Sequence, residues 1–96
     1  MLELRPGCEI CDRDLPPAST EAVICSFECT FCARCATEVL HDVCPNCGGG
    51  FSPRPIRPTD ALGEHPPSTR RVVKPVNEAR HAELLARHRD RPPARR

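Results

Sequence analysis

Residues 25 to 35 read CSFECTFCARC and place four cysteines in eleven positions. If this stretch were a helix, Cys25 and Cys35 would lie about 15 Å apart along its axis, at about 1.5 Å per residue. One metal ion cannot bridge that distance, because zinc–sulfur bonds are only about 2.3 Å long. The four thiols therefore serve two sites, and each site needs partners from outside the stretch.

Four further cysteines flank the stretch as two C-x-x-C pairs, so that the whole pattern is C-x2-C-x13-C-x3-C-x2-C-x2-C-x8-C-x2-C. A C-x-x-C pair lets a tight turn aim two thiolates at one ion, and two pairs complete a tetrahedral zinc site. The pattern therefore predicts two zinc ions. Spacing alone leaves two divisions open. In the sequential division the sites are Cys8/Cys11/Cys25/Cys29 and Cys32/Cys35/Cys44/Cys47, and in the interleaved one they are Cys8/Cys11/Cys32/Cys35 and Cys25/Cys29/Cys44/Cys47.

The two halves of the chain differ in composition. Residues 1–50 hold three arginines against eight acids, a balance of −5, and residues 51–96 hold ten arginines and one lysine against five acids, a balance of +6. All eight cysteines lie in the first half, whose few apolar side chains cannot supply a sufficient core without disulfides or metal. No stretch has the length of a signal-peptide core or a membrane span. We therefore expect a cytoplasmic chain with reduced cysteines that bind metal.

Local patterns predict little regular structure in the first half. A short strand is expected near Ala22–Ile24, and the segment ATEVLHDV after Cys35 has good helix formers that end before Pro45. Cys32 and Cys35 would then lie at the start of a short helix, where the helix dipole favours thiolates. A C-x-x-C turn, a short hairpin and two ligands at a helix start make up a treble-clef arrangement.

The order of the eight cysteines resembles a RING finger, with Cys29 at the position that is usually histidine. The ending C-P-x-C is present as residues 44–47, and an apolar residue, Ile10, precedes the second ligand. More closely, residues 1 to about 57 resemble a family of short uncharacterised bacterial proteins, catalogued as a domain of unknown function with a RING-like zinc pattern. The resemblance rests on MLELRP, CDRDLPP, ICSFECTFCA and CPNCGG. It implies a small cross-braced module with the interleaved ligand sets, and no established activity.

The same resemblance directs attention to a contact surface. Eukaryotic RING domains act as ubiquitin ligases by holding a conjugating enzyme near the position of Ile10, so Ile10, Val39 and Pro45 are the candidate partner contacts. Val39 stands where ligases often have tryptophan, and Gly48 stands where they often have a basic residue, which disfavours ligase activity. Eight thiolates for two ions leave no open coordination position, so we expect structural sites and no enzyme. Iron–sulfur clusters are the rival cofactor.

The second half predicts a mostly disordered tail after a two-zinc module at residues 1–51. Residues 52–76 are a linker rich in proline and arginine, 77–90 form a helix that Asn77 can cap, and 91–96 are a basic end. That helix is too short to be stable alone and would form on contact with the module, a partner or another copy. The tail stays solvated and keeps the protein soluble, folds back on the acidic half, or contacts nucleic acid.

The expected role is a non-enzymatic adaptor that binds another protein, with no membrane and no small-molecule substrate. Two other functions stay open: a nucleic-acid-binding regulator that uses the basic tail, and a zinc buffer or thiol redox sensor. The sequence identifies no partner or pathway.

Overall fold

A three-stranded antiparallel sheet lies at the centre of this computed structural model, which describes all 96 residues. β1 (Ala22–Ile24) pairs with β2 (Thr30–Cys32) on one side and β3 (Ser52–Pro53) on the other, in the order β2-β1-β3. The strand expected at Ala22–Ile24 is present. The sequence did not predict β3, which is an edge strand, the place in a sheet where a proline without an N–H is tolerated.

A short helix, η1 (Cys35–Val39), follows β2 almost directly and takes the place of the helix expected after Cys35. It is a π-helical turn, since the N–H of Leu40 donates to the carbonyl of Cys35 over 2.9 Å, five residues back. The turn buries Cys35 and Ala36 and leaves Val39 exposed.

The core of the head, as we call residues 1–51, is small and contains sulfur. Phe31 is fully buried and contacts Phe51 edge-on, with ring centroids 5.4 Å apart and planes at 69°. Four further aliphatic side chains are almost completely buried, and six cysteines are buried with them: Leu4, Leu15, Leu40 and Val43, and Cys8, Cys25, Cys29, Cys32, Cys35 and Cys44. Apolar packing and the cysteines therefore occupy the same volume.

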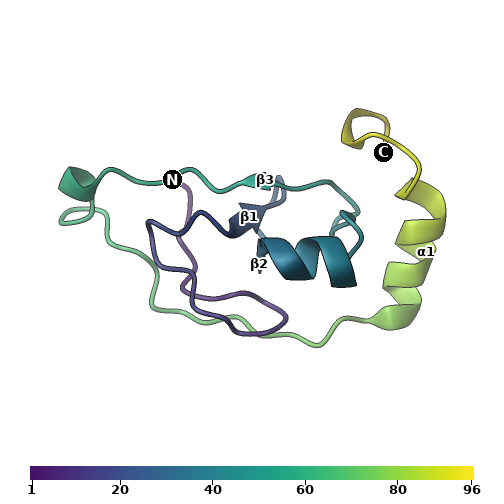
Figure 1. Cartoon of the computed structure of the whole chain (residues 1–96), viewed down its shortest axis with the longest axis horizontal. Coiled ribbons are helices and arrows are strands. Elements are labelled where there is room, and N and C mark those ends of the chain that lie inside the picture. The colour runs from purple at the N-terminus through teal and green to yellow at the C-terminus, as the bar shows by residue number, and fades with distance from the viewer.

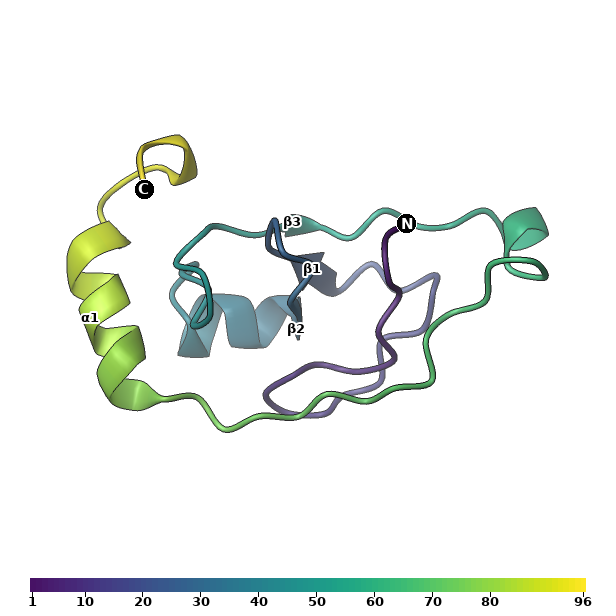
Figure 2. The same ribbon diagram turned by 180° about the vertical axis from the view of Figure 1, so that it is seen from behind.

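The tail, residues 52–96, is ordered, which corrects the expectation of a mostly disordered tail. Figures 1 and 2 show its green part running along the N-terminal loop before the chain reaches α1 (Glu78–His88). Two short 3-10 turns, η2 (Thr59–Ala61) and η3 (Pro93–Arg95), interrupt it. Backbone hydrogen bonds join it to the head, from Ser68 N to Leu4 O (2.9 Å) and from Lys74 N to Glu9 O (3.0 Å).

Arginine side chains supply the main reason why the tail is ordered. Arg54 is 3% exposed, and its guanidinium donates to the carbonyls of Arg5 (2.9 Å), Leu15 (3.0 Å) and Pro16 (2.9 Å). Burial lowers the pKa of Arg54, but no acid is needed to hold the guanidinium, because three carbonyls accept hydrogen bonds from it. A segment rich in proline has few N–H groups to bond, so these side-chain donors take their place.

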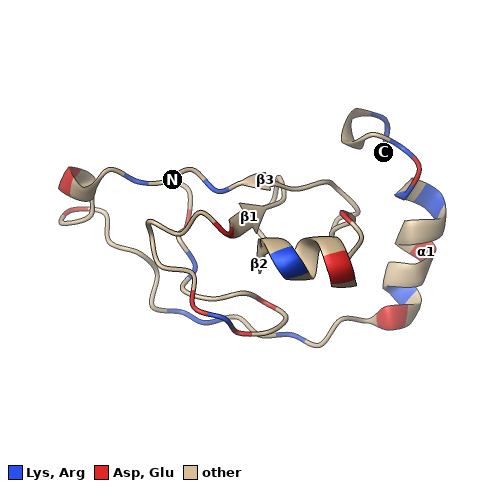
Figure 3. Cartoon of the chain, in the orientation of Figure 1, with Lys and Arg blue, Asp and Glu red and all other residues tan.

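Other tail cations are held by the head in the same way. Arg57 donates to the carbonyl of Leu2 over 2.7 Å, and Arg71 forms ion pairs with Asp12 and Asp14, both at 2.8 Å. The charged segments that meet here can be followed in Figure 3. Of the arrangements considered for the tail, the structure shows the one in which it folds back on the acidic half.

Helix α1 occupies the segment for which the sequence predicts a helix, and Asn77 caps it by accepting from the N–H of Arg80 over 3.1 Å. Its anchor is His81, which is 6% exposed and whose Nε2 lies 3.2 Å from Leu40 O and 3.0 Å from Val43 O. Carbonyls only accept, so Nε2 carries the proton. The helix thus forms against the head, and no helix in the chain has the length and apolar character needed to cross a membrane.

Candidate metal centres

The two C-x-x-C turns of the head have the same backbone geometry. In each turn the residue after the second cysteine has a positive φ, 60° at Asp12 and 77° at Gly48. That residue donates its N–H to the carbonyl of the first cysteine, over 3.0 Å to Cys8 and 2.8 Å to Cys44. The first cysteine in turn donates to a carbonyl five residues on, over 2.9 and 2.8 Å. We call these turns the first and second knuckles.

Four cysteine sulfurs meet between the first knuckle and the start of η1. The sulfurs of Cys8, Cys11, Cys32 and Cys35 all lie within 4.8 Å of one another, and Cys11 Sγ is 3.9 Å from Cys32 Sγ. Zinc–sulfur bonds of about 2.3 Å in a tetrahedron require sulfurs about 3.8 Å apart, so this group fits a metal ion of that kind. Backbone N–H groups point at the sulfurs, from Ile10 to Cys8 (3.5 Å) and from Cys35 to Cys32 (3.4 Å).

A second group forms between the second knuckle and the turn that joins β1 to β2. The sulfurs of Cys25, Cys44 and Cys47 lie within 4.8 Å of one another. Cys29, the fourth cysteine of this predicted set, is not part of that group, although it lies beside it and is buried. Its sulfur contacts the Cys25 thiol and also accepts a hydrogen bond from Asn46 Nδ2 over 3.3 Å. The structure thus brings the cysteines together in the interleaved order, with four in one group and three in the other.

The crowded thiols change each other's acidity. A hydrogen bond from the Cys44 thiol lowers the pKa of Cys25 to about 5, and the same contact raises the pKa of Cys44. Burial raises the pKa of Cys8 and of Cys35. One thiolate in a group therefore makes a second thiolate costly unless a cation lies between them. A donor set of soft sulfurs, with no disulfide among them, suits a metal ion.

Buried polar side chains hold these groups in place, and the sequence interpretation missed them. Glu9 is 3% exposed, and its carboxylate accepts from the N–H of Thr30 and from Arg5 Nη1 (2.7 Å), which ties the first knuckle to β2. Asn46 has a comparable role at Cys29. Glu9 lies inside the first C-x-x-C turn, between Cys8 and Ile10. This acidic residue within a metal-binding turn is the sequence signal that could have pointed to it.

None of the four histidines belongs to a metal group. His41 and His65 are exposed, while His81 anchors α1 and His88 covers Gly48. His88 Nδ1 is buried without a hydrogen-bond partner, and burial lowers the pKa of this imidazole. The expectation that the ligands are cysteines alone stays a prediction.

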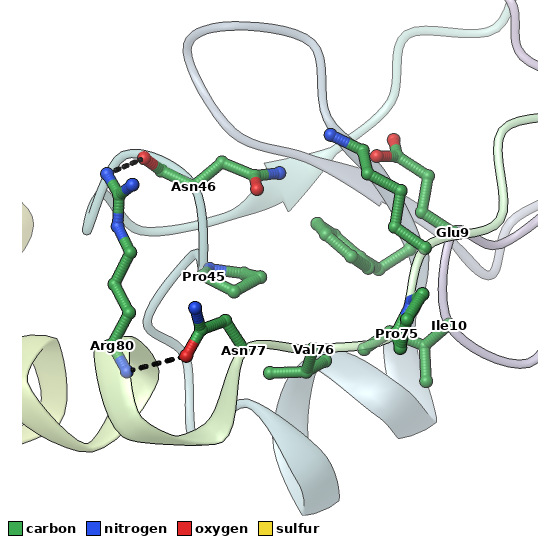
Figure 4. Close-up of a pocket in the computed structure, with 10 residues that line it drawn as sticks. Glu9, Ile10, Pro45, Asn46, Pro75, Val76, Asn77 and Arg80 are labelled. Atoms are coloured by element: carbon green, nitrogen blue, oxygen red, sulfur yellow. Dashed lines mark hydrogen bonds between the residues drawn. The ribbon is translucent and has the colours of Figure 1, made fainter.

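The three candidate partner contacts do not lie on one surface. Ile10 and Val39 line the same cavity of about 310 Å³ beside the first sulfur group. Ile10 and Pro45 line another cavity of about 230 Å³, together with tail residues 74–77 and Arg80 (Figure 4). The tail therefore occupies the side of Ile10 that faces Pro45 and leaves the side that faces Val39 open.

Comparison with known proteins agrees with the resemblance described above. Residues 1–57 match the family described as "Protein of unknown function (DUF1272)". An uncharacterized protein of Rhizobium meliloti (strain 1021) is 61% identical over 75 residues, which are 78% of this chain and 89% of that protein. No solved structure matches the chain. The matched segment contains every cysteine of both sulfur groups, and the chain belongs to the DUF1272 family.

Proposed function

We propose that the chain is a RING-like module with two zinc ions that hold its fold, and that its role is to bind another protein. The observation that carries the proposal is the interleaved grouping of the cysteine sulfurs. Each group joins one knuckle to the hairpin that carries β1 and β2, so two ions would brace the knuckles across the sheet.

Zinc is the metal that this donor set favours. Every donor in both groups is a cysteine sulfur, and cysteine-only tetrahedral sites are characteristic of structural zinc. The paired knuckles support zinc over an iron–sulfur cluster, because each fixes two sulfurs at the spacing of one tetrahedral ion. Calcium and magnesium are disfavoured, since they prefer oxygen ligands.

The ions would supply free energy that the small core lacks. In zinc-finger peptides a structural site contributes about 10–16 kcal/mol to folding at neutral pH. Here the fully buried aliphatic and aromatic side chains are few, and six of the ten residues of the core cluster are cysteines. Zinc therefore stabilises the fold, and the head has no enzymatic role.

The partner would bind on the side of the first knuckle that the tail leaves open. Val39 is 46% exposed although it belongs to η1, and it shares a cavity with Ile10. Exposed apolar side chains on a small domain held rigid by metal are suited to a protein contact.

Native mass spectrometry tests the metal part of the proposal. Protein refolded with zinc under reducing conditions should carry two ions, and Cys32→Ser should lose one of them and partly unfold the head. Ser26→Ala is the control, because Ser26 lies next to Cys25 but offers no sulfur. A wild-type protein that folds with no bound zinc would refute the proposal.

Site-specific crosslinking tests the protein-binding part. A photoreactive residue at position 39 should capture a defined protein in cells that express the chain, and chelation should abolish the capture. The same residue at position 56 is the control, since Ile56 is 53% exposed but lies in the tail. Equal capture from both positions would remove the support for a surface at Ile10 and Val39.

A further inference from the structure

The two sulfur groups are not equivalent, and the difference lies at Cys29. The first group has four sulfurs within 4.8 Å of one another, and the second has three. We propose that Cys25, Cys44 and Cys47 form the permanent part of the second site, whereas Cys29 is an exchangeable ligand. This inference rests on the two-zinc proposal and deepens it, because it assigns metal exchange to one of the two sites.

The turn that carries Cys29 explains its position. Three residues separate Cys25 from Cys29, where a knuckle has two, and the turn closes through Glu28 N to Cys25 O (3.0 Å) and Cys25 N to Cys29 O (3.2 Å). Glu28 has a φ of 64°, and its carboxylate accepts from the N–H of Glu3 over 3.1 Å. The backbone next to Cys29 is thus held by a contact with the N-terminal segment, and its sulfur is not placed by a knuckle.

Asn46 gives the Cys29 sulfur a partner outside the metal group, in addition to its contact with the Cys25 thiol. Its side-chain amide donates to Cys29 Sγ over 3.3 Å, while its backbone carbonyl accepts from Arg80 Nη2 over 3.2 Å. Figure 4 shows Asn46 at the rim of the cavity with Arg80 on α1 beside it. Cys47, in contrast, takes its N–H bond from Gly49 within the same knuckle (3.4 Å). Through Arg80, helix α1 therefore helps to position Asn46, which in turn donates to the Cys29 sulfur.

Three permanent thiolates leave the fourth coordination position to be shared. Either Cys29 fills it, or a small neutral nitrogen or oxygen donor does, as in zinc sites with three protein ligands. Such a site can pass its ion to an acceptor by ligand exchange without unfolding the knuckle. The first site, with four grouped sulfurs, has no such position, so exchange is confined to the second.

A matched pair of variants tests the difference. Cys29→Ser and Cys11→Ser each remove one cysteine from a site, and the zinc affinity of each is measured by competition with a chromogenic chelator. Loss of a permanent ligand should lower the zinc affinity of that site by more than about 100-fold. This exceeds the loss that is typical when a residue hydrogen-bonded to a ligand is replaced. We expect the loss of zinc affinity caused by Cys29→Ser to be at least tenfold smaller than the loss of zinc affinity caused by Cys11→Ser. A smaller gap would overturn the inference.

X-ray absorption of the wild-type protein loaded with zinc provides a measurement that needs no variant. With imidazole added in excess as the competing donor, four sulfurs at one ion and three at the other give an average of about 3.5 sulfur neighbours per zinc, with a nitrogen neighbour at the remaining position. An average that stays at four in imidazole would overturn the exchangeable role of Cys29 but would leave the two-zinc module intact. Protein that binds no zinc would instead refute the module itself.

Discussion

At the scale of single residues, Gly48 is a position where both backbone conformation and space oppose a side chain. Its φ is 77°, and an added Cβ would lie 3.0 Å from His88 Cδ2 and 3.3 Å from Leu84 Cδ2. A side chain in the left-handed region costs about 1–2 kcal/mol. Gly48→Ala should therefore lower the free energy of unfolding by at least that amount in urea denaturation of the metal-loaded protein. Gly63→Ala, where nothing lies within 4 Å, is the control and should change stability little.

Arg54 is a second residue whose replacement should lower the stability of the protein. Arg54→Met keeps the length of the side chain but leaves the carbonyls of Arg5 and Leu15 without a donor, while the Pro16 carbonyl keeps the N–H of Ser19. Since an unpaired buried polar group costs about 1–3 kcal/mol, we expect a loss of roughly 2–4 kcal/mol of stability in the same assay. Arg70→Met changes an exposed arginine of the tail and should cost much less. Equal losses would contradict the role of Arg54 as an anchor.

At the scale of elements, α1 depends on one histidine for its position. His81→Ala removes the N–H that bonds Leu40 O and Val43 O, and an isolated helix of eleven residues is marginal in water. We expect amide hydrogens at 78–88 to exchange with solvent much faster while the number of bound metal ions stays the same. His65→Ala, at an exposed histidine, should leave exchange unchanged. Simultaneous loss of a metal ion would show that His81 supports the second knuckle as well.

The elements also show how far a sequence can specify this fold. The strand at Ala22–Ile24, the helix capped by Asn77 and the two cysteine-rich turns follow from local patterns of alternation, capping and spacing. β3 has only two residues and includes a proline, so its pairing is decided by the sheet that it joins. His81 and Asn46 act through contacts more than fifteen residues away in sequence, which no local pattern contains.

At the scale of the whole molecule, metal should hold the tail as well as the head. α1 packs on the segment between η1 and the second knuckle, so loss of the second site would remove its support. Chelation under reducing conditions should therefore collapse the amide spectrum of residues 1–51 and also abolish the helical circular dichroism of 78–88. A helix that persists after the head unfolds would contradict this coupling.

The disordered tail was the part of the sequence interpretation that was wrong. Eight prolines and a surplus of arginine are typical of a linker, yet here the arginines of the tail donate to backbone carbonyls of the head, and the prolines keep the chain extended along it. Composition does not reveal such contacts, because the acceptors are backbone groups present in every sequence. The interleaved arrangement, by contrast, was one of only two divisions that spacing allowed.

The fastening of the tail through Arg54, Arg57 and Arg71 has a consequence for the order of events during translation. All eight cysteines leave the ribosome well before the last of these arginines. At about 5–20 residues per second, the 24 residues from Cys47 to Arg71 take roughly 1–5 seconds to synthesise. During that interval the nascent chain presents its thiols before the tail packs on the head, so metal ions can bind first and the tail then docks on a head that already holds them.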